Sequence, residues 1–187
     1  WYRAGGQGAR QTVALSAGRD ASLEWLPQET ILFDGADVTL EHEVELAPGA
    51  AYIGSEILCF GRAAAGERFT HGALRQRTRI RQAGRLVWLE QGRLAGGSAG
   101  MASPLGLGGR HVCATLIGVG RPAPASLLAS LRGADAALGL TQLKSVFVAR
   151  YLCDDSEAAR HALTRVWQAL RPHLLGLEAH TPRIWNT

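Results

Sequence analysis

Strict alternation between apolar and polar side chains in the middle of the chain limits its fold more than any other feature. Between residues 37 and 46, apolar side chains fill every second position except at His42, and acidic or hydroxyl side chains lie between them. Because successive side chains of a β-strand point to opposite faces, the segment is predicted to be a strand with one apolar and one acidic face. We interpret His42 as a core or edge histidine rather than as a ligand.

A second alternating segment, residues 74–82, carries a row of arginines on one face: Arg75, Arg77, Arg79 and Arg81. Like charges two residues apart repel one another, so the row should be solvated or should meet carboxylates. Its partner is then the acidic face of residues 39–45, an acidic protein or, if the chain is a basic β module, a nucleic acid. Net charge is only +4, and aromatic residues, which stack on bases, make up 6% of the chain. We therefore expect no nucleic-acid partner and favour an intramolecular or solvated row.

The remainder of the chain consists mostly of short strand-like segments, about ten in all, separated by turns such as Asp34-Gly35 and Pro48-Gly49. Two helices are expected, a short one near residues 126–131 and a longer one near the C-terminus. The longer helix has an apolar stripe formed by Ala159, Leu163, Val166, Trp167 and Leu170. Pro172 should end or kink it. Since strands and helices do not alternate, we predict a mainly β, mainly antiparallel fold with its helices gathered late in the chain.

The chain has 187 residues, of which 47% are hydrophobic, enough for one domain with a sizeable core, and we assign residues 1–187 to it. Its three widely spaced cysteines are typical of reduced thiols in a cytoplasmic protein. We expect no membrane partner, because no apolar run approaches the roughly 20 residues of a spanning helix and no signal peptide is recognisable. No glycine pattern fits a nucleotide-binding loop. Because the sequence starts with Trp1 inside a strand-like segment, we expect the natural N-terminal segment to be missing.

The stretch from residue 50 to residue 90 contains most of the side chains that could act as a nucleophile, an acid or base, or a metal ligand. Cys59 and His71 have the residue types of a cysteine-dependent hydrolase, which is our alternative function. Cys59, however, lies inside an apolar strand rather than at a helix N-terminus, where a thiolate is stabilised, and is expected to be structural. Closely spaced Cys and His pairs of the kind that bind zinc are lacking.

Two carboxylates in this stretch are placed on apolar faces. Glu56 shares its face with Leu58 and Phe60, and Glu90 shares its face with Leu86 and Trp88. A buried carboxylate is costly unless it is paired or binds a metal ion. Glu56 and Glu90, on neighbouring strands, therefore either line a polar passage or ion site, or each pairs with an arginine nearby in the sequence, Arg62 or Arg85.

Several longer motifs resemble one known family. Residues 23–36, residues 59–69, residues 148–152 with the helix after them, and the closing residues 182–187 are similar to signatures of the urease accessory protein D family (UreD, also called UreH). The resemblance covers the whole chain, and the motifs are long enough to be specific. Members of the family usually carry a further N-terminal segment of roughly a third of their length.

The resemblance implies a fold and a function. The fold is a β-helix-like stack of short strands with two helices. The function is that of a non-enzymatic scaffold or chaperone for nickel insertion into urease apoprotein. Its partners are urease accessory protein F, the GTPase accessory protein G through F, and urease itself. A passage through the protein is thought to carry nickel, and Glu56 and Glu90 are our first candidates for lining it, with Cys59 and His71 as lesser ones.

Overall fold

The computed structural model describes residues 1–186, in which ten strands and three α-helices form. The strands are β1 (Ala9–Ala17), β2 (Ser22–Trp25), β3 (Thr30–Leu32), β4 (Asp37–Leu46), β5 (Ala51–Phe60), β6 (Ala73–Gln82), β7 (Arg85–Ala95), β8 (Val112–Val119), β9 (Gly139–Leu143) and β10 (Val146–Cys153). The helices are α1 (Ala99–Ala102), α2 (Ala125–Ala134) and α3 (Ser156–Leu175), with 3-10 turns at Ala63–Ala65 and Arg183–Asn186. The predicted mainly β fold with a long C-terminal helix is confirmed. Of the C-terminal motif, Thr187 lies outside the described residues.

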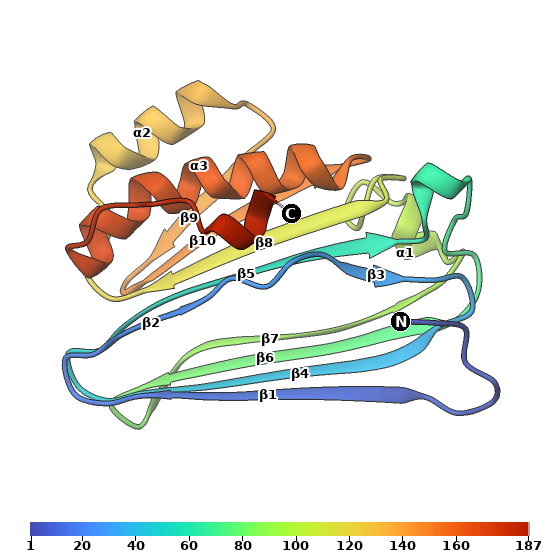
Figure 1. The fold of residues 1–187 in the computed structure, drawn as a ribbon, viewed down its shortest axis with the longest axis horizontal. Coiled ribbons are helices and arrows are strands. Elements are labelled where there is room, and N and C mark those ends of the chain that lie inside the picture. The colour runs from blue at the N-terminus through green and yellow to red at the C-terminus, as the bar shows by residue number, and fades with distance from the viewer. Residues whose placement is uncertain (187) are drawn as a thin grey trace.

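Two sheets face each other (Figure 1). Sheet A has the strand order β1-β4-β6-β7, and sheet B has the order β2-β5-β8-β10-β9, with β3 also paired to β5. From β1 to β6 the chain passes back and forth between the sheets, and all four pairings within this coil are parallel. This coil is the β-helix-like part of the fold. The other pairings are antiparallel.

The expectation of a mainly antiparallel fold was therefore wrong for the first half of the chain. The turn at Pro48-Gly49 shows the reason, because it passes the chain from sheet A to sheet B rather than back along sheet A. Gly49 adopts φ +78°, and the Asp20 side chain fills the space that a Cβ atom would need there. Turn residues in a sequence mark a reversal of direction, but they do not say in which sheet the next strand continues.

The arginine row lies on the outer face of sheet A and meets the acidic face of β4, as predicted. In the parallel register, Glu41, Glu43 and Glu45 lie directly opposite Arg77, Arg79 and Arg81. The nitrogen–oxygen distances of these pairs range from 3.3 to 3.6 Å, and Arg75 meets Asp37 at 2.5 Å. The resulting ion-pair ladder pairs the two rows with each other within the chain.

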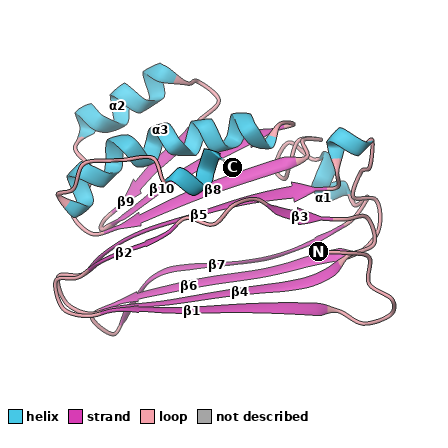
Figure 2. Ribbon diagram, viewed as in Figure 1, coloured by secondary structure: helices cyan, strands magenta, loops and turns pink. Residues whose placement is uncertain are grey.

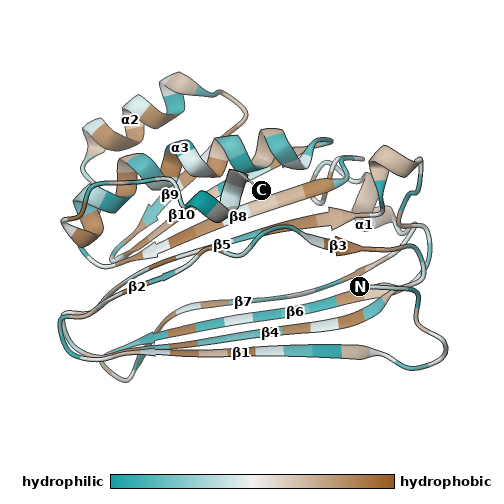
Figure 3. Cartoon of the chain, in the orientation of Figure 1, coloured by the Kyte–Doolittle hydropathy of each residue, from teal (hydrophilic) through white to brown (hydrophobic). Residues whose placement is uncertain are grey.

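The outer face of sheet B is apolar and is covered by α3 (Figures 2 and 3). The predicted stripe of α3 is fully buried against β5, β8 and β10. Gly118 of β8 allows this close approach, since an added Cβ atom there would lie 2.8 Å from Leu170 and from Leu174. Pro172 does not end the helix, which continues to Leu175 and closes with Gly176 at φ +67°.

Side-chain bonds also tie α3 to β2. The Nε1 atom of Trp167 donates to Glu24 Oε1 at 2.6 Å, and Nε of Arg171 donates to Glu24 Oε2 at 3.0 Å. The second half of the chain is thereby anchored to the first coil. None of the helices within residues 1–186 has both the length and the apolar character needed to cross a bilayer.

Candidate functional site: a polar belt between the two sheets

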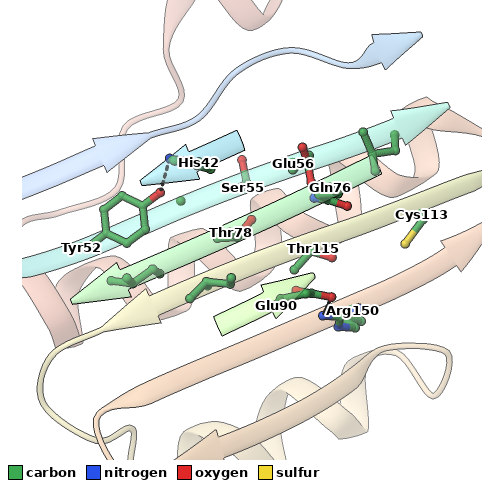
Figure 4. Close-up of a pocket in the computed structure, with 14 residues that line it drawn as sticks. His42, Tyr52, Ser55, Glu56, Gln76, Thr78, Glu90, Cys113, Thr115 and Arg150 are labelled. Carbon is green, nitrogen blue, oxygen red and sulfur yellow. Dashed lines mark hydrogen bonds and ion pairs between the residues drawn. The ribbon is translucent and has the colours of Figure 1, made fainter. Parts of the chain in front are cut away.

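The apolar core between the sheets is interrupted. One cluster lies at the end with the β4–β5 turn and includes Val44, Leu46, Tyr52, Ile80, Val119 and Val148. A separate cluster at the other end includes Leu32, Val38, Leu58, Phe60, Phe69 and Leu74. Between them the inward positions of both sheets are polar, and the polar belt consists of His42, Glu56, Gln76, Thr78, Glu90, Thr115 and Arg150. Figure 4 shows these side chains gathered between the strands.

Two adjoining cavities, each of about 60 Å³, lie in the polar belt. One reaches Glu90 and Arg150 on β7 and β10, and the other reaches Gln11 and Thr30 on β1 and β3. Both are lined by the same five residues, His42, Ser55, Glu56, Gln76 and Thr78. These shared polar residues lie between the two cavities, and the β1/β3 cavity is also lined by apolar side chains such as Val13, Trp25 and Leu40. A water molecule needs at least about 10–15 Å³ and two to four polar partners, so each cavity has room for several.

Glu56 lies at the centre of the polar belt, on the inner face of β5. Its carboxylate accepts a hydrogen bond from Nε2 of Gln76 on the facing sheet. Burial raises the pKa of Glu56 to about 7; the Gln76 bond opposes this rise, the nearby charge of Glu90 adds to it, and Arg150 counteracts it. The expectation that Glu56 points inward is confirmed, and its contact is an amide rather than an arginine.

Glu90 faces Glu56 from β7, so the two carboxylates belong to opposite sheets and not to neighbouring strands as expected. Its Oε1 atom accepts a hydrogen bond from Arg150 of β10 at 2.5 Å. Glu90 is thus paired with an arginine, but Arg62 binds Glu67 instead, and Arg85 lies at the start of β7. A β-bulge between Ile80 and Arg81 also moves Leu86 to the outer face, away from Trp88 and Glu90.

His42 lies buried between the two sheets, in agreement with its interpretation as a core or edge histidine, and it is part of the polar belt. It lies 3.4 Å from the Tyr52 hydroxyl, and burial lowers its pKa, which favours the neutral imidazole. The same hydroxyl occupies the space where Gly54 would carry a Cβ atom, so any larger residue at position 54 would displace Tyr52. Polar residues at inward positions of alternating strands are the sequence signal for His42, Gln76 and Thr78.

The structure separates Cys59 from the polar belt. Cys59 lies on the opposite face of β5, in the apolar cluster under α3, and burial raises the pKa of its thiol to about 11. A thiol so strongly protonated is a poor nucleophile and a poor ligand. Cys59 therefore does not line the polar belt.

His71 lies elsewhere again. Its side chain is 80% exposed in the turn before β6, where Nδ1 lies 3.2 Å from Asp34 Oδ2. His71 forms its hydrogen bonds with Thr70 and Asp34, and it does not line the cavity at Cys59. The Cys59–His71 contact that a hydrolase would need is therefore not formed. His71 orders the turn that leads into β6.

The polar belt offers two carboxylates and one imidazole to a cation, and these are spread along it. Among residues 1–186, no group of three or more His, Cys, Asp or Glu side chains converges on a point that could hold a metal ion. Such spacing is unsuited to a tightly held structural ion, which needs four or more converging ligands.

The raised pKa of Glu56 predicts that the free energy of unfolding depends on pH. From the ordinary value of 4.5 to about 7, the folded state keeps a proton that the unfolded state has released, so the free energy of unfolding should fall as pH rises through this window. We expect wild type to lose about 3 kcal/mol relative to Glu56→Gln between pH 4.5 and pH 7.5, because each pKa unit corresponds to about 1.4 kcal/mol. Urea titrations of both proteins across this range measure the difference. Parallel pH profiles would contradict it.

Comparison with known proteins assigns the chain to a family. Residues 1–186 match the family described as "UreD urease accessory protein". The chain is 55% identical to the urease accessory protein UreD of Janthinobacterium sp. (strain Marseille), covering all of this chain and 65% of that protein. It is 50% identical to the protein of the same name from Nitrosospira multiformis, covering all of this chain and 70% of that protein. The chain thus spans about two thirds of the length of these relatives, and it belongs to the UreD family of urease accessory proteins.

Proposed function

We propose that this protein is a non-enzymatic scaffold in urease maturation, and that Ni²⁺ crosses it through the polar belt on the way to urease apoprotein. The observation that carries the proposal is the group of polar side chains shared by two adjoining cavities between the apolar clusters of the sandwich. Family membership supports the role in urease maturation. Nickel insertion, the route of the ion and the partners are the parts that we add.

The chemistry of the polar belt suits an ion in transit. Ni²⁺ accepts imidazole and carboxylate ligands, and His42, Glu56 and Glu90 present these in sequence along the lining. Conduction requires binding strong enough for entry and weak enough for release, usually at several successive sites. Water in the cavities would keep the ion partly hydrated between contacts, so it need not lose its whole hydration shell at any one step.

The partners follow from the resemblance of residues 23–36, 59–69 and 148–152 to the family signatures. We propose that the protein binds urease accessory protein F and, through F, the GTPase accessory protein G. It would also contact urease apoprotein in the cytoplasm. A scaffold of this kind needs no catalytic residue of its own. The raised pKa of the Cys59 thiol and its separation from His71 support that view.

Co-expression tests the proposal. The full-length protein that contains this chain should form a stable complex with urease accessory protein F in size-exclusion chromatography. Its deletion from cells that express urease and all the other accessory proteins should leave the urease largely free of nickel. Separate elution of the two folded proteins would contradict the partnership. Normal nickel content of urease in the deletion cells would contradict the function.

A further inference from the structure

The β7/β10 end of the polar belt is built differently from the β1/β3 end. Glu90 stands opposite Thr78 in sheet A, and Arg150 stands opposite Thr115 in sheet B, so their ion pair joins the two sheets across the cavity. β9 pairs with β10 only as far as Arg150, which leaves the end of β10 without a neighbour on that side. Figure 4 shows Glu90 and Arg150 meeting end to end at this edge. The pair therefore lies across the mouth of the cavity.

Charge distinguishes the two ends more sharply. Arg150 is the only arginine or lysine among the described residues that line the two cavities, and it lines only the β7/β10 cavity. A guanidinium at a mouth repels an approaching cation. Arg150 also forms an ion pair with Glu90, and this pairing neutralises the carboxylate that would otherwise attract the cation.

Exposure makes the ion pair easy to open. The side chain of Arg150 is 44% exposed and that of Glu90 is 30% exposed. Exposed ion pairs contribute little to stability, typically about 0.2–1 kcal/mol, so the pair can separate at small cost. Rotation of the Arg150 side chain towards solvent would free Glu90 and would remove the positive charge from the mouth.

We infer that Arg150 is a charge gate on the polar belt: bound to Glu90 it closes the β7/β10 mouth to cations, and turned into solvent it opens the mouth. The inference depends on the proposed function only for the identity of the cation as Ni²⁺. It makes Arg150 a specificity-determining residue that does not itself bind the ion.

The thiol of Cys113 can be used to measure which ions pass this gate. Cys113 lines the same cavity as Arg150 and Glu90, whereas Cys59 lies on the far face of sheet B. The rate at which Cys113 reacts with small charged reagents therefore measures which charges pass the mouth. Cys59 and Cys153 serve as internal references when labelling is quantified on each peptide by mass spectrometry.

The experiment compares wild type with Arg150→Met and Arg150→Lys in the full-length protein. The reagents are the cation 2-aminoethyl methanethiosulfonate and the anion 2-sulfonatoethyl methanethiosulfonate. We expect Arg150→Met to raise the cation-to-anion ratio of Cys113 labelling about tenfold, because it removes one positive charge and frees one negative charge a few ångströms from the path. Arg150→Lys keeps the charge and should stay near wild type. The ratio also cancels any change in the pKa of the Cys113 thiol, which burial raises and the charge of Arg150 opposes.

Arg165→Met is the matched control, because Arg165 forms an ion pair of similar exposure with Asp135 outside the polar belt, and it should leave the ratio unchanged. If Arg150→Met folds poorly, Arg150→Gln replaces it. An unchanged ratio in the folded variant, or equal acceleration of both reagents, would overturn the charge gate. Nickel loading of urease is measured separately. A raised labelling ratio with normal loading by carboxamide variants of Glu56 and Glu90 would support the gate and overturn nickel transit.

Discussion

Replacing both carboxylates of the polar belt, Glu56→Gln with Glu90→Gln, should lower the nickel content of urease at least about tenfold. Glutamine keeps the size of each side chain and its ability to hydrogen bond, but it removes the carboxyl groups whose ionised form attracts the ion. Unit charges about 4 Å apart interact by several kcal/mol at the effective dielectric of a protein interior, and the loss of even 1.4 kcal/mol corresponds to a factor of ten. Nickel per purified urease, measured in cells that express all the accessory proteins, gives the result.

Glu43→Gln with Glu45→Gln is the matched control, because these carboxylates lie on the outer face of sheet A and pair with the arginine row. This variant should load urease normally. Both variants should still form the complex with accessory protein F. Full loading by the Glu56, Glu90 variant would remove these residues from the route. Its failure to accumulate as soluble protein would instead assign them a structural role.

Trp167→Ala should have the largest effect on stability, lowering the free energy of unfolding by about 3–5 kcal/mol. Trp167 is 2% exposed and fills the space between α3 and sheet B. Its removal leaves a large cavity and also deprives Glu24 of a hydrogen bond, although Arg171 still pairs with that carboxylate. Urea denaturation of the folded protein, followed by circular dichroism, measures the change.

Two further variants separate the contributions at Trp167. Trp167→Phe keeps much of the apolar volume but loses the Nε1 donor, so its cost should be smaller than that of the alanine variant. Leu177→Ala removes an exposed apolar side chain just beyond α3 and should change stability by no more than about 0.5 kcal/mol. A loss below about 1 kcal/mol in Trp167→Ala would show that α3 is not held by this residue.

Much of the fold could be predicted because its signals are local. The alternation of residues 37–46 and 74–82 predicted both strands and both charged faces, and it favoured an intramolecular or solvated arginine row, which the structure shows paired with β4. The apolar stripe predicted α3. The parallel coil could not be predicted, because the direction of pairing depends on which sheet each turn enters. That choice is made by non-local contacts, such as the one between Asp20 and Gly49.

The candidate site was predicted only in part, for the same physical reason. An inward position on an alternating strand predicted the orientation of Glu56 and Glu90. Their contacts come from distant strands, since Arg150 lies 60 residues after Glu90 and could not be chosen over the nearby Arg85 from spacing alone. Cys59 was a poor candidate for the passage because one step along a strand reverses the face. Glu56 and Leu58 share one face of the strand, so Cys59, one residue further on, was already expected on the opposite face.

The cover of sheet B by α3 has a consequence for biosynthesis. β5 occupies residues 51–60, whereas the helix that shields its outer face ends near residue 175. At translation rates of about 5–20 residues per second, roughly 5–20 seconds separate the synthesis of these two elements. During that interval the nascent chain presents an unshielded apolar face to the crowded surroundings of the ribosome. A product truncated before the end of α3 would leave this apolar face exposed and would tend to aggregate. The availability of chaperones and the rate of translation should therefore affect the yield of this protein.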